Sequence, residues 1–266
     1  MRLFAVALAW CLALLAPAHA ETQRFSLDYA GSAWGLISVG GARLDIELQE
    51  DGAYSASGTV RSGGIAALFL RTQIEVAAEG EIDDGSVRWE RYSLEHFYDN
   101  VHRHINMRPT SATVQASISP LYPDGWGTPP ASDAQKRAAR DPLSSLIAMA
   151  NDVGATRRCQ GDYMTFDGRW LYRLEVRGGE QHEFESGAYM GPALRCRVRY
   201  FPVAGFAPTD QGYRDPPPPG SVWFALIEGE RFAPPVRASM PLPLGTAQLT
   251  LRAMEMTEDV TLTGAQ

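Results

Sequence analysis

Alternation of apolar and polar residues along most of the 266-residue chain predicts an all-β fold built on a long antiparallel sheet. Two other features shape this prediction. Residues 142–151 have the periodicity of an amphipathic helix, and two cysteines in the second half can form a disulfide. We therefore expect a leader over residues 1–20 and a single β-rich domain over residues 21–266, in which short helices pack against the sheet.

The leader is typical of a signal peptide for export. Arg2 supplies a positive charge, residues 3–15 are apolar, and Ala18 and Ala20 form the small-x-small pattern that signal peptidase requires. Cleavage is expected between Ala20 and Glu21. Because the apolar stretch is short for a membrane span, we expect a mature protein that lies outside the cytoplasm and does not span a membrane.

The N-terminal half has the pattern of a strand meander. Apolar residues alternate with polar ones in five segments, 24–29, 43–49, 74–78, 87–89 and 114–118. Ile37 and Val39 place apolar residues at odd positions, so the change of parity at Gly40 and Gly41 predicts a turn or a bulge. Turn residues at 83–85 separate two of the later strands.

Residues 120–141 interrupt the strand pattern because they are rich in Pro, Gly and Ala. Asp141 is a suitable N-cap and Pro142 suits the first helical position. Apolar residues follow at positions i, i+3, i+4 and i+7, namely Leu143, Leu146, Ile147 and Ala150. We expect a helix over 142–151 that is covered by a sheet face, since about three turns are not stable alone in water. Residues 65–70 are a second helix candidate.

Strands resume after the helix. Met164 and Phe166 lead into a turn at Asp167 and Gly168, and alternation over 169–177 predicts the returning strand of a β-hairpin. Strand-like sequence also covers 195–200, 221–227 and 247–256, and the proline run 216–219 predicts a stiff extended connection.

Cys159 and Cys196 are expected to form a structural disulfide. Cys11 is removed with the leader, and an even pair of cysteines in an oxidising compartment is normally bridged. A redox pair would usually have Cys-x-x-Cys spacing, which these two lack. Cys196, Val198 and Tyr200 share the apolar face of their strand, so the bridge should be buried.

The charge and size of the chain exclude several classes of function. A net charge of −7 argues against nucleic-acid binding and against polybasic docking to anionic lipid. A domain of this length buries enough surface to fold without a metal or a cofactor, so we expect none.

Three histidines lie close together in residues 95–104. If Asp99 and Asn100 form a two-residue turn, Phe97 faces His102 and Glu95 faces His104 on one face of the hairpin. His102 and His104 are then candidate metal ligands, with Glu95 as a third. The alternative, which the pattern favours, is a solvated hairpin face without a metal, because the other face carries apolar core residues.

Catalytic motifs are not evident in the sequence. We find no Gly-x-Ser-x-Gly elbow, no His-Glu-x-x-His motif and no phosphate-binding glycine loop, and the acidic residues have no diagnostic spacing. Three arginines on the polar face of one strand could hold an anionic headgroup or a glycan, or could be a solvated face: Arg195, Arg197 and Arg199.

Five short motifs occur in a characteristic order: Asp51-Gly52-Ala53-Tyr54-Ser55 with Gly58, Asp141-Pro142-Leu143-Ser144-Ser145-Leu146, Phe166-Asp167-Gly168-Arg169, Cys196-x-Val198 leading to Pro202-x-x-Gly205, and Pro235-Val236-Arg237. Over nearly all of the mature chain, the sequence resembles the bacterial exported proteins of domain-of-unknown-function family 3108. It is more distantly similar to the β-spiral proteins of cell-envelope integrity and to periplasmic lipoprotein carriers. The resemblance implies a periplasmic location and a long curved antiparallel sheet or an incompletely closed, β-spiral-like barrel, with one or two short helices against its concave face. It implies no reaction, because the family has no established activity.

We therefore expect a non-catalytic periplasmic protein that supports the cell envelope by binding a lipid or another hydrophobic ligand. The expected ligand contacts are Leu143, Leu146, Ile147, Arg195, Arg197 and Arg199. One alternative is a hydrolase of envelope glycan (peptidoglycan), with two carboxyls and an aromatic platform such as Trp126 in one cleft. Another is a structural adaptor that binds a second envelope protein through an exposed sheet edge.

Overall fold

The computed structural model describes residues 19–64, 67, 71–98, 100–123, 125–207, 215, 217–242 and 245–262. The expected signal peptide therefore lies outside the described residues, except for the backbone of His19 and Ala20. The second helix candidate, 65–70, also lies outside them except for Ala67.

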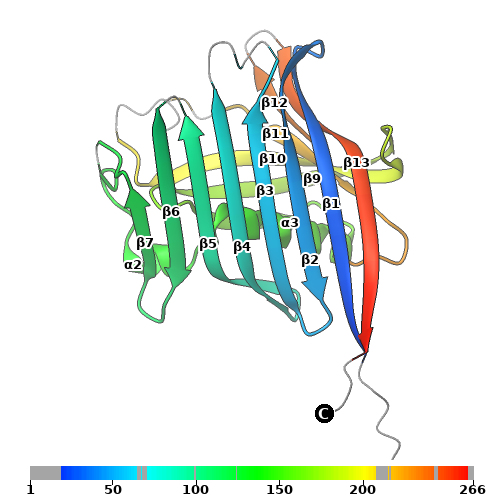
Figure 1. Cartoon of the computed structure of the whole chain (residues 1–266), viewed down its shortest axis with the longest axis horizontal. Coiled ribbons are helices and arrows are strands. Elements are labelled where there is room, and N and C mark those ends of the chain that lie inside the picture. The colour runs from blue at the N-terminus through cyan, green and yellow to red at the C-terminus, as the bar shows by residue number, and fades with distance from the viewer. Residues whose placement is uncertain are drawn as a thin grey trace, which may run out of the picture.

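Thirteen strands form one antiparallel sheet, which confirms the predicted all-β class (Figure 1). The strands are β1 (His19–Ala33), β2 (Ile37–Gln49), β3 (Ala53–Ser62), β4 (Thr72–Asp83), β5 (Ser86–Tyr98), β6 (Val101–Pro109), β7 (Val114–Ser119), β8 (Gly161–Phe166), β9 (Leu171–Glu185), β10 (Met190–Ala204), β11 (Gly220–Ala225), β12 (Pro235–Leu242) and β13 (Gly245–Leu262). Their order is β7-β6-β5-β4-β3-β2-β1-β13-β12-β11-β10-β9-β8. Every neighbour follows in sequence except β1 and β13, whose pairing joins the two ends of the chain in the middle of the sheet.

The sheet curves so strongly that its two halves face each other. In Figure 1, β2 to β7 run side by side in front, while β9 and β10 cross behind them with helix α3 (Pro142–Thr156) in between. The outermost strands, β7 and β8, are not paired with each other, so the barrel is incompletely closed, as predicted.

Side chains and loops cover the seam between the two outermost strands. Tyr122, in the segment after β7, lies between two cations: the guanidinium carbons of Arg103 and Arg169 are 3.9 Å and 4.6 Å from its ring centroid. Gly168 has φ 105°, and a Cβ there would lie 2.8 Å from Cγ2 of Ile105. Only glycine allows the β8–β9 turn to approach β6 this closely.

Alternation of apolar and polar residues buries one face of each strand and exposes the other face to solvent. Phe25 and Leu27 of β1 are at most 1% exposed. Arg24, which precedes Phe25, points to the other face and forms an ion pair with Glu47 of β2 at 3.0 Å. The predicted irregularity at Gly40 is a bulge rather than a turn, because β2 continues through it. Gly40 has φ 139°, and a Cβ there would lie 2.0 Å from the carbonyl oxygen of Arg61.

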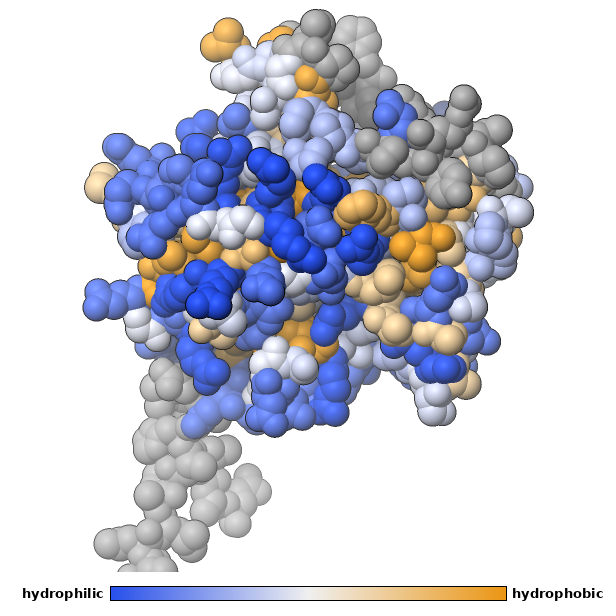
Figure 2. Space-filling view, turned by 180° about the vertical axis from the view of Figure 1, so that it is seen from behind, coloured by the Kyte–Doolittle hydropathy of each residue, from blue (hydrophilic) through white to orange (hydrophobic). Residues whose placement is uncertain are grey.

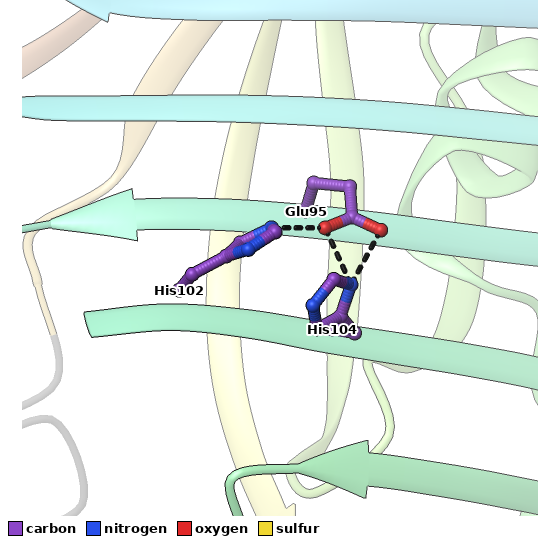
Figure 3. Close-up of side chains that lie close together, drawn as sticks. All are labelled: Glu95, His102 and His104. Carbon is purple, nitrogen blue, oxygen red and sulfur yellow. Dashed lines mark hydrogen bonds and ion pairs between the residues drawn. The ribbon is translucent and has the colours of Figure 1, made fainter.

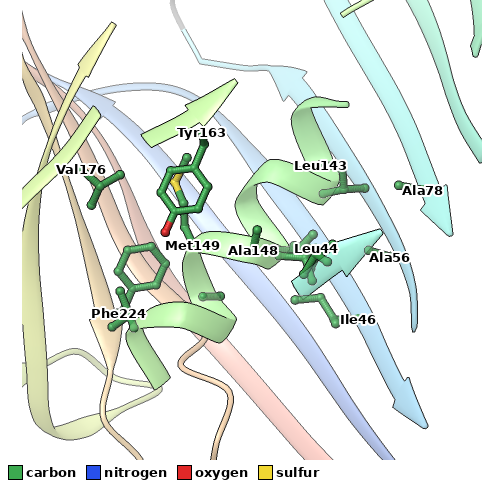
Figure 4. Close-up of a cluster of buried hydrophobic side chains, with 14 of the residues drawn as sticks. Leu44, Ile46, Ala56, Ala78, Leu143, Ala148, Met149, Tyr163, Val176 and Phe224 are labelled. Carbon is green, nitrogen blue, oxygen red and sulfur yellow. The ribbon is translucent and has the colours of Figure 1, made fainter. Parts of the chain in front are cut away.

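The amphipathic helix is present and longer than expected. Asp141 is its N-cap, with Oδ1 accepting from the backbone N–H groups of Leu143 and Ser144 at 2.9 Å. Figure 4 shows α3 between side chains of the first half of the sheet, such as Leu44, and side chains of the second half, such as Phe224. The helix continues to Thr156, beyond the predicted end, because Val153 and Gly154 of the added turn are buried too.

A short helix that the sequence analysis did not predict, α2 (Asp133–Arg137), lies in the Pro- and Ala-rich segment. Ser132 and Gln135 form a reciprocal capping box, which is the sequence signal for this helix. Among the described residues, no helix is both long enough and apolar enough to cross a bilayer.

The predicted hairpin and disulfide are both found in the second half. Oδ1 of Asp167 accepts hydrogen bonds from the backbone N–H groups of Arg169 and Trp170, which forms the turn between β8 and β9. Cys159 and Cys196 are bridged, and they are 3% and 0% exposed. The bridge ties the segment that follows α3 to β10, two strands in from the β8 edge of the sheet.

Candidate ligand-binding site

A cavity of about 220 Å³ lies between α3 and the concave face of the sheet. Three parts of the chain form its walls: strands β1 to β4, the first turns of α3, and strands β11 to β13. The inward residues of these walls are Tyr29, Ala42, Leu44, Gly58, Val60, Val76, Leu143, Leu146, Val222, Ala238 and Leu249.

The cavity exists because neighbouring strands carry small residues at inward positions. Ala42, Gly58 and Ala238 lie where other strands place leucine, phenylalanine or tyrosine. A Cβ at Gly58 would already approach Cγ2 of Val76 at 3.2 Å. Helix α3 fills the rest of the barrel, and these small residues leave a hollow beside its N-terminal half.

Groups that could carry charge at the border of the cavity are neutral or turned away. Tyr29 donates its hydroxyl to the carbonyl of Pro235 at 2.6 Å, and burial raises the pKa of Tyr29 well above its usual value, so the phenol stays neutral. Arg43 points outward, where its guanidinium binds Asp45. Arg237 lies over the ring of Phe184, 4.6 Å from its centroid. The surface that a ligand would meet is therefore hydrocarbon.

A larger groove of about 450 Å³ adjoins the cavity. The two share Val222, Ala238 and Leu249, and the groove adds apolar residues such as Val198 and Met240. Met240 of the groove is 43% exposed, and Val60 of the cavity is 42% exposed. The apolar interior therefore opens to solvent at this end of the barrel.

The structure brings together part of the predicted ligand-contact set. Leu143 and Leu146 line the cavity. Ile147, which is 0% exposed, packs in the solid core instead. The predicted helix thus supplies one wall of the candidate site through its first turns.

The predicted arginine row lies on the opposite face of the sheet. Cys196 and Val198 point inward, so Arg195, Arg197 and Arg199 point outward and are exposed. The guanidinium carbon of Arg195 lies 5.1 Å from the Trp223 ring centroid. Figure 2 shows the molecule from behind relative to Figure 1, and hydrophilic side chains cover most of this surface, with smaller hydrophobic areas between them. These arginines cannot contact a ligand in the cavity.

Two acids, Asp141, which is buried, and Asp167, which is half-buried, act as local caps. Burial raises the pKa of Asp141 to about 6 and also raises the pKa of Asp167. Raised values are common in catalytic acids. Here, however, each carboxyl accepts backbone N–H groups at the start of a helix or within a turn. The aromatic platform suggested for a hydrolase, Trp126, is 39% exposed.

The polar cluster predicted on the β5–β6 hairpin has the expected register. Phe97 pairs with His102, Glu95 with His104, and His96 with Arg103. The cluster lies on the outer face of the sheet, away from the cavity.

Sequence reasoning missed the cavity residues contributed by the strands. Tyr29 was placed on the apolar face of an alternating segment, and Val222 and Leu249 lie in segments predicted as strands, whereas Val60 lay in no predicted strand; nothing local marked the four as neighbours of one hollow. The signal available in the sequence was the presence of small residues, such as Ala42 and Ala238, at inward positions.

Comparisons with known proteins give a family and a fold. The family model described as "Protein of unknown function (DUF3108)" matches residues 24–252. Among solved structures, the chain is similar to a beta-barrel-like protein of domain of unknown function DUF1849 from Brucella abortus. That match has a TM-score of 0.53 and 11% identity, and it covers 91% of this chain and 100% of the other. No curated protein matches.

Proposed function

Because the chain belongs to the DUF3108 family, whose description names no activity, we propose a function from the cavity: binding of a hydrophobic ligand, without catalysis, in the periplasm. The ligand class is a lipid acyl chain. The observation that carries this proposal is the solvent-open, apolar cavity beside α3.

The chemistry of the walls favours an acyl chain over a polar ligand. A polar group that enters such a site loses its hydrogen bonds to water and finds no replacement, which costs several kcal/mol by transfer scales, roughly 2–7. A methylene group gains about 0.8 kcal/mol on burial. The cavity therefore selects for hydrocarbon.

The size of the site suits one chain with part of its length in the groove. Binding pockets commonly measure about 300–1,000 Å³. The cavity of about 220 Å³ is small for a whole lipid, but the adjoining groove of about 450 Å³ extends it with further apolar surface. We propose that the chain end enters beside Leu146 and that the headgroup stays near the exposed rim.

The proposed location and role rest on the sequence. Residues 1–20 have the pattern of an export signal, and the disulfide between Cys159 and Cys196 is stable in an oxidising compartment. Support of the cell envelope through lipid binding is consistent with the export signal and with the disulfide.

The test is a binding experiment with a cavity-filling variant. The full chain is titrated with a dansyl-labelled fatty acid, whose fluorescence rises in an apolar site, and lipids that co-purify are identified by native mass spectrometry after extraction. Ala238→Leu should weaken binding by at least about tenfold, because exclusion of two methylenes costs about 1.6 kcal/mol.

The matched control is Ala77→Leu. Ala78 is 1% exposed and points inward, so Ala77 on the same strand points to the outer face. This control should bind like the unmodified protein. Equal affinities for both variants, or a protein that neither carries lipid nor binds the probe, would contradict the proposal.

A further inference from the structure

A cluster of three potential metal ligands lies on the outer face of the sheet (Figure 3). Glu95 comes from β5, and His102 and His104 come from β6. Their direction follows from alternation: Arg103 and Ile105, which flank His104, are 7% and 3% exposed and point inward. The two histidines therefore share the outer face, and the register places Glu95 directly opposite His104.

The ligand atoms already converge. One nitrogen of each histidine and the carboxylate of Glu95 all lie within 4.8 Å of one another. Nε2 of His102 is 2.5 Å from Oε2 of Glu95, and Nδ1 of His104 is 2.7 Å from Oε1. Both rings thus direct a nitrogen at one carboxylate.

We propose that Glu95, His102 and His104 form a binding site for a divalent transition-metal ion, with zinc as the ion that fits best. Two imidazoles and one carboxylate are a donor set that zinc commonly takes. With metal–ligand distances of about 2.0–2.2 Å, tetrahedral coordination separates ligand atoms by roughly 3.3 Å. The side chains need to move apart by less than about 1 Å from their present hydrogen-bonded separations.

The surroundings hold the ligands in place. The ring of Phe97 stacks on His102, with centroids 4.0 Å apart and planes at 16°, which restricts rotation of that imidazole. The His102 and His104 rings lie 3.9 Å apart. The fixed register of the hairpin therefore places Glu95 opposite His104, and the stacked ring of Phe97 orients His102, before any ion arrives.

The electrostatics favour a cation. The carboxylate of Glu95 provides a negative charge within hydrogen-bonding distance of both imidazoles. Glu75 of β4 lies directly across from Glu95 and brings a second negative charge to the same face.

Exposure of the cluster leaves room for further ligands. The side chains of Glu95, His102 and His104 are 35%, 42% and 43% exposed. Solvent can therefore reach the ion, and water can occupy the remaining coordination position, as in zinc sites with three protein ligands.

The test is isothermal titration of the full, untagged chain with zinc chloride after treatment with a chelator. One ion should bind per chain with micromolar or tighter affinity. His102→Gln and His104→Gln should each weaken binding by at least about tenfold, the lower range measured when a supporting group of a metal site is lost. His182→Gln is the matched control, since His182 lies on β9 beside Glu180 and should leave the affinity unchanged.

A second measurement does not depend on variants. Cobalt(II) bound to the unmodified chain should show the intense visible absorption of a four-coordinate site, and zinc should displace it. No binding below millimolar zinc, or equal binding by the His102→Gln, His104→Gln and His182→Gln variants, overturns the proposal. Neither outcome bears on the apolar cavity, which has its own probe.

Discussion

The N-cap of α3 should make the stability of the protein depend on pH in a direction opposite to that of most acids. Asp141 is 0% exposed, and its Oδ1 accepts two backbone hydrogen bonds. Its Oδ2 is buried and has no hydrogen-bond partner among the described residues. We predict that Asp141→Asn, which keeps the capping oxygen and removes the charge, abolishes this dependence.

The sign and the size of this pH dependence follow from the shift in the pKa of Asp141. Burial raises the pKa of Asp141 from 3.8 to about 6 in the folded state, so the folded protein binds the proton more tightly than the unfolded chain does. Ionisation therefore costs stability as pH rises from about 4 through 6. A shift of about 2 pKa units corresponds to about 3 kcal/mol at neutral pH.

The assay is urea unfolding at pH 3.5 and pH 7.5, followed by circular dichroism. The difference in unfolding free energy between Asp141→Asn and the unmodified protein should move by about 3 kcal/mol in favour of the variant at the higher pH. Any constant cost of the buried amide cancels in this comparison. Asp84→Asn, in an exposed turn, is the control and should show no such change. Parallel pH profiles for Asp141→Asn and the unmodified protein would refute the reasoning.

Three further predictions concern stability. Replacing Cys159 and Cys196 together with serine should lower the unfolding free energy by about 3.8 kcal/mol, because the bridge closes a loop of 37 residues; an unchanged urea midpoint would contradict this. Ile147→Ala should cost about 2–5 kcal/mol, since the side chain is 0% exposed, and a loss below 1 kcal/mol in the same assay would show a looser core. Gly127→Ala should cost more than about 2 kcal/mol of stability, because a Cβ there would lie 1.7 Å from the backbone oxygen of Gly205. Gly125→Ala, where a Cβ would have no neighbour within 4 Å, should cost about 1 kcal/mol. Equal melting temperatures for the two variants would count against this difference.

Features that depend on neighbouring residues were predictable from the sequence. Alternation gave the inward face of most strands, and the Asp141–Pro142 start gave the helix. The register that sets Glu95 opposite His104 followed from a two-residue turn, because a short turn leaves little freedom for pairing. The predicted end of the helix was wrong because burial of Val153 and Gly154, rather than local propensity, extends the helix to Thr156.

Local sequence patterns are sufficient to predict an all-β chain with a capped helix, a cysteine pair and a histidine-bearing hairpin. Long-range contacts are needed to show that β1 pairs with β13, that the sheet curves around α3, and that Ala42 and Ala238 face one hollow. They are also needed to show that the arginine row on β10 lies on the face away from that hollow. The physical reason is that alternation specifies two faces for every strand, whereas long-range pairing and curvature determine which face becomes concave and which distant segments meet there.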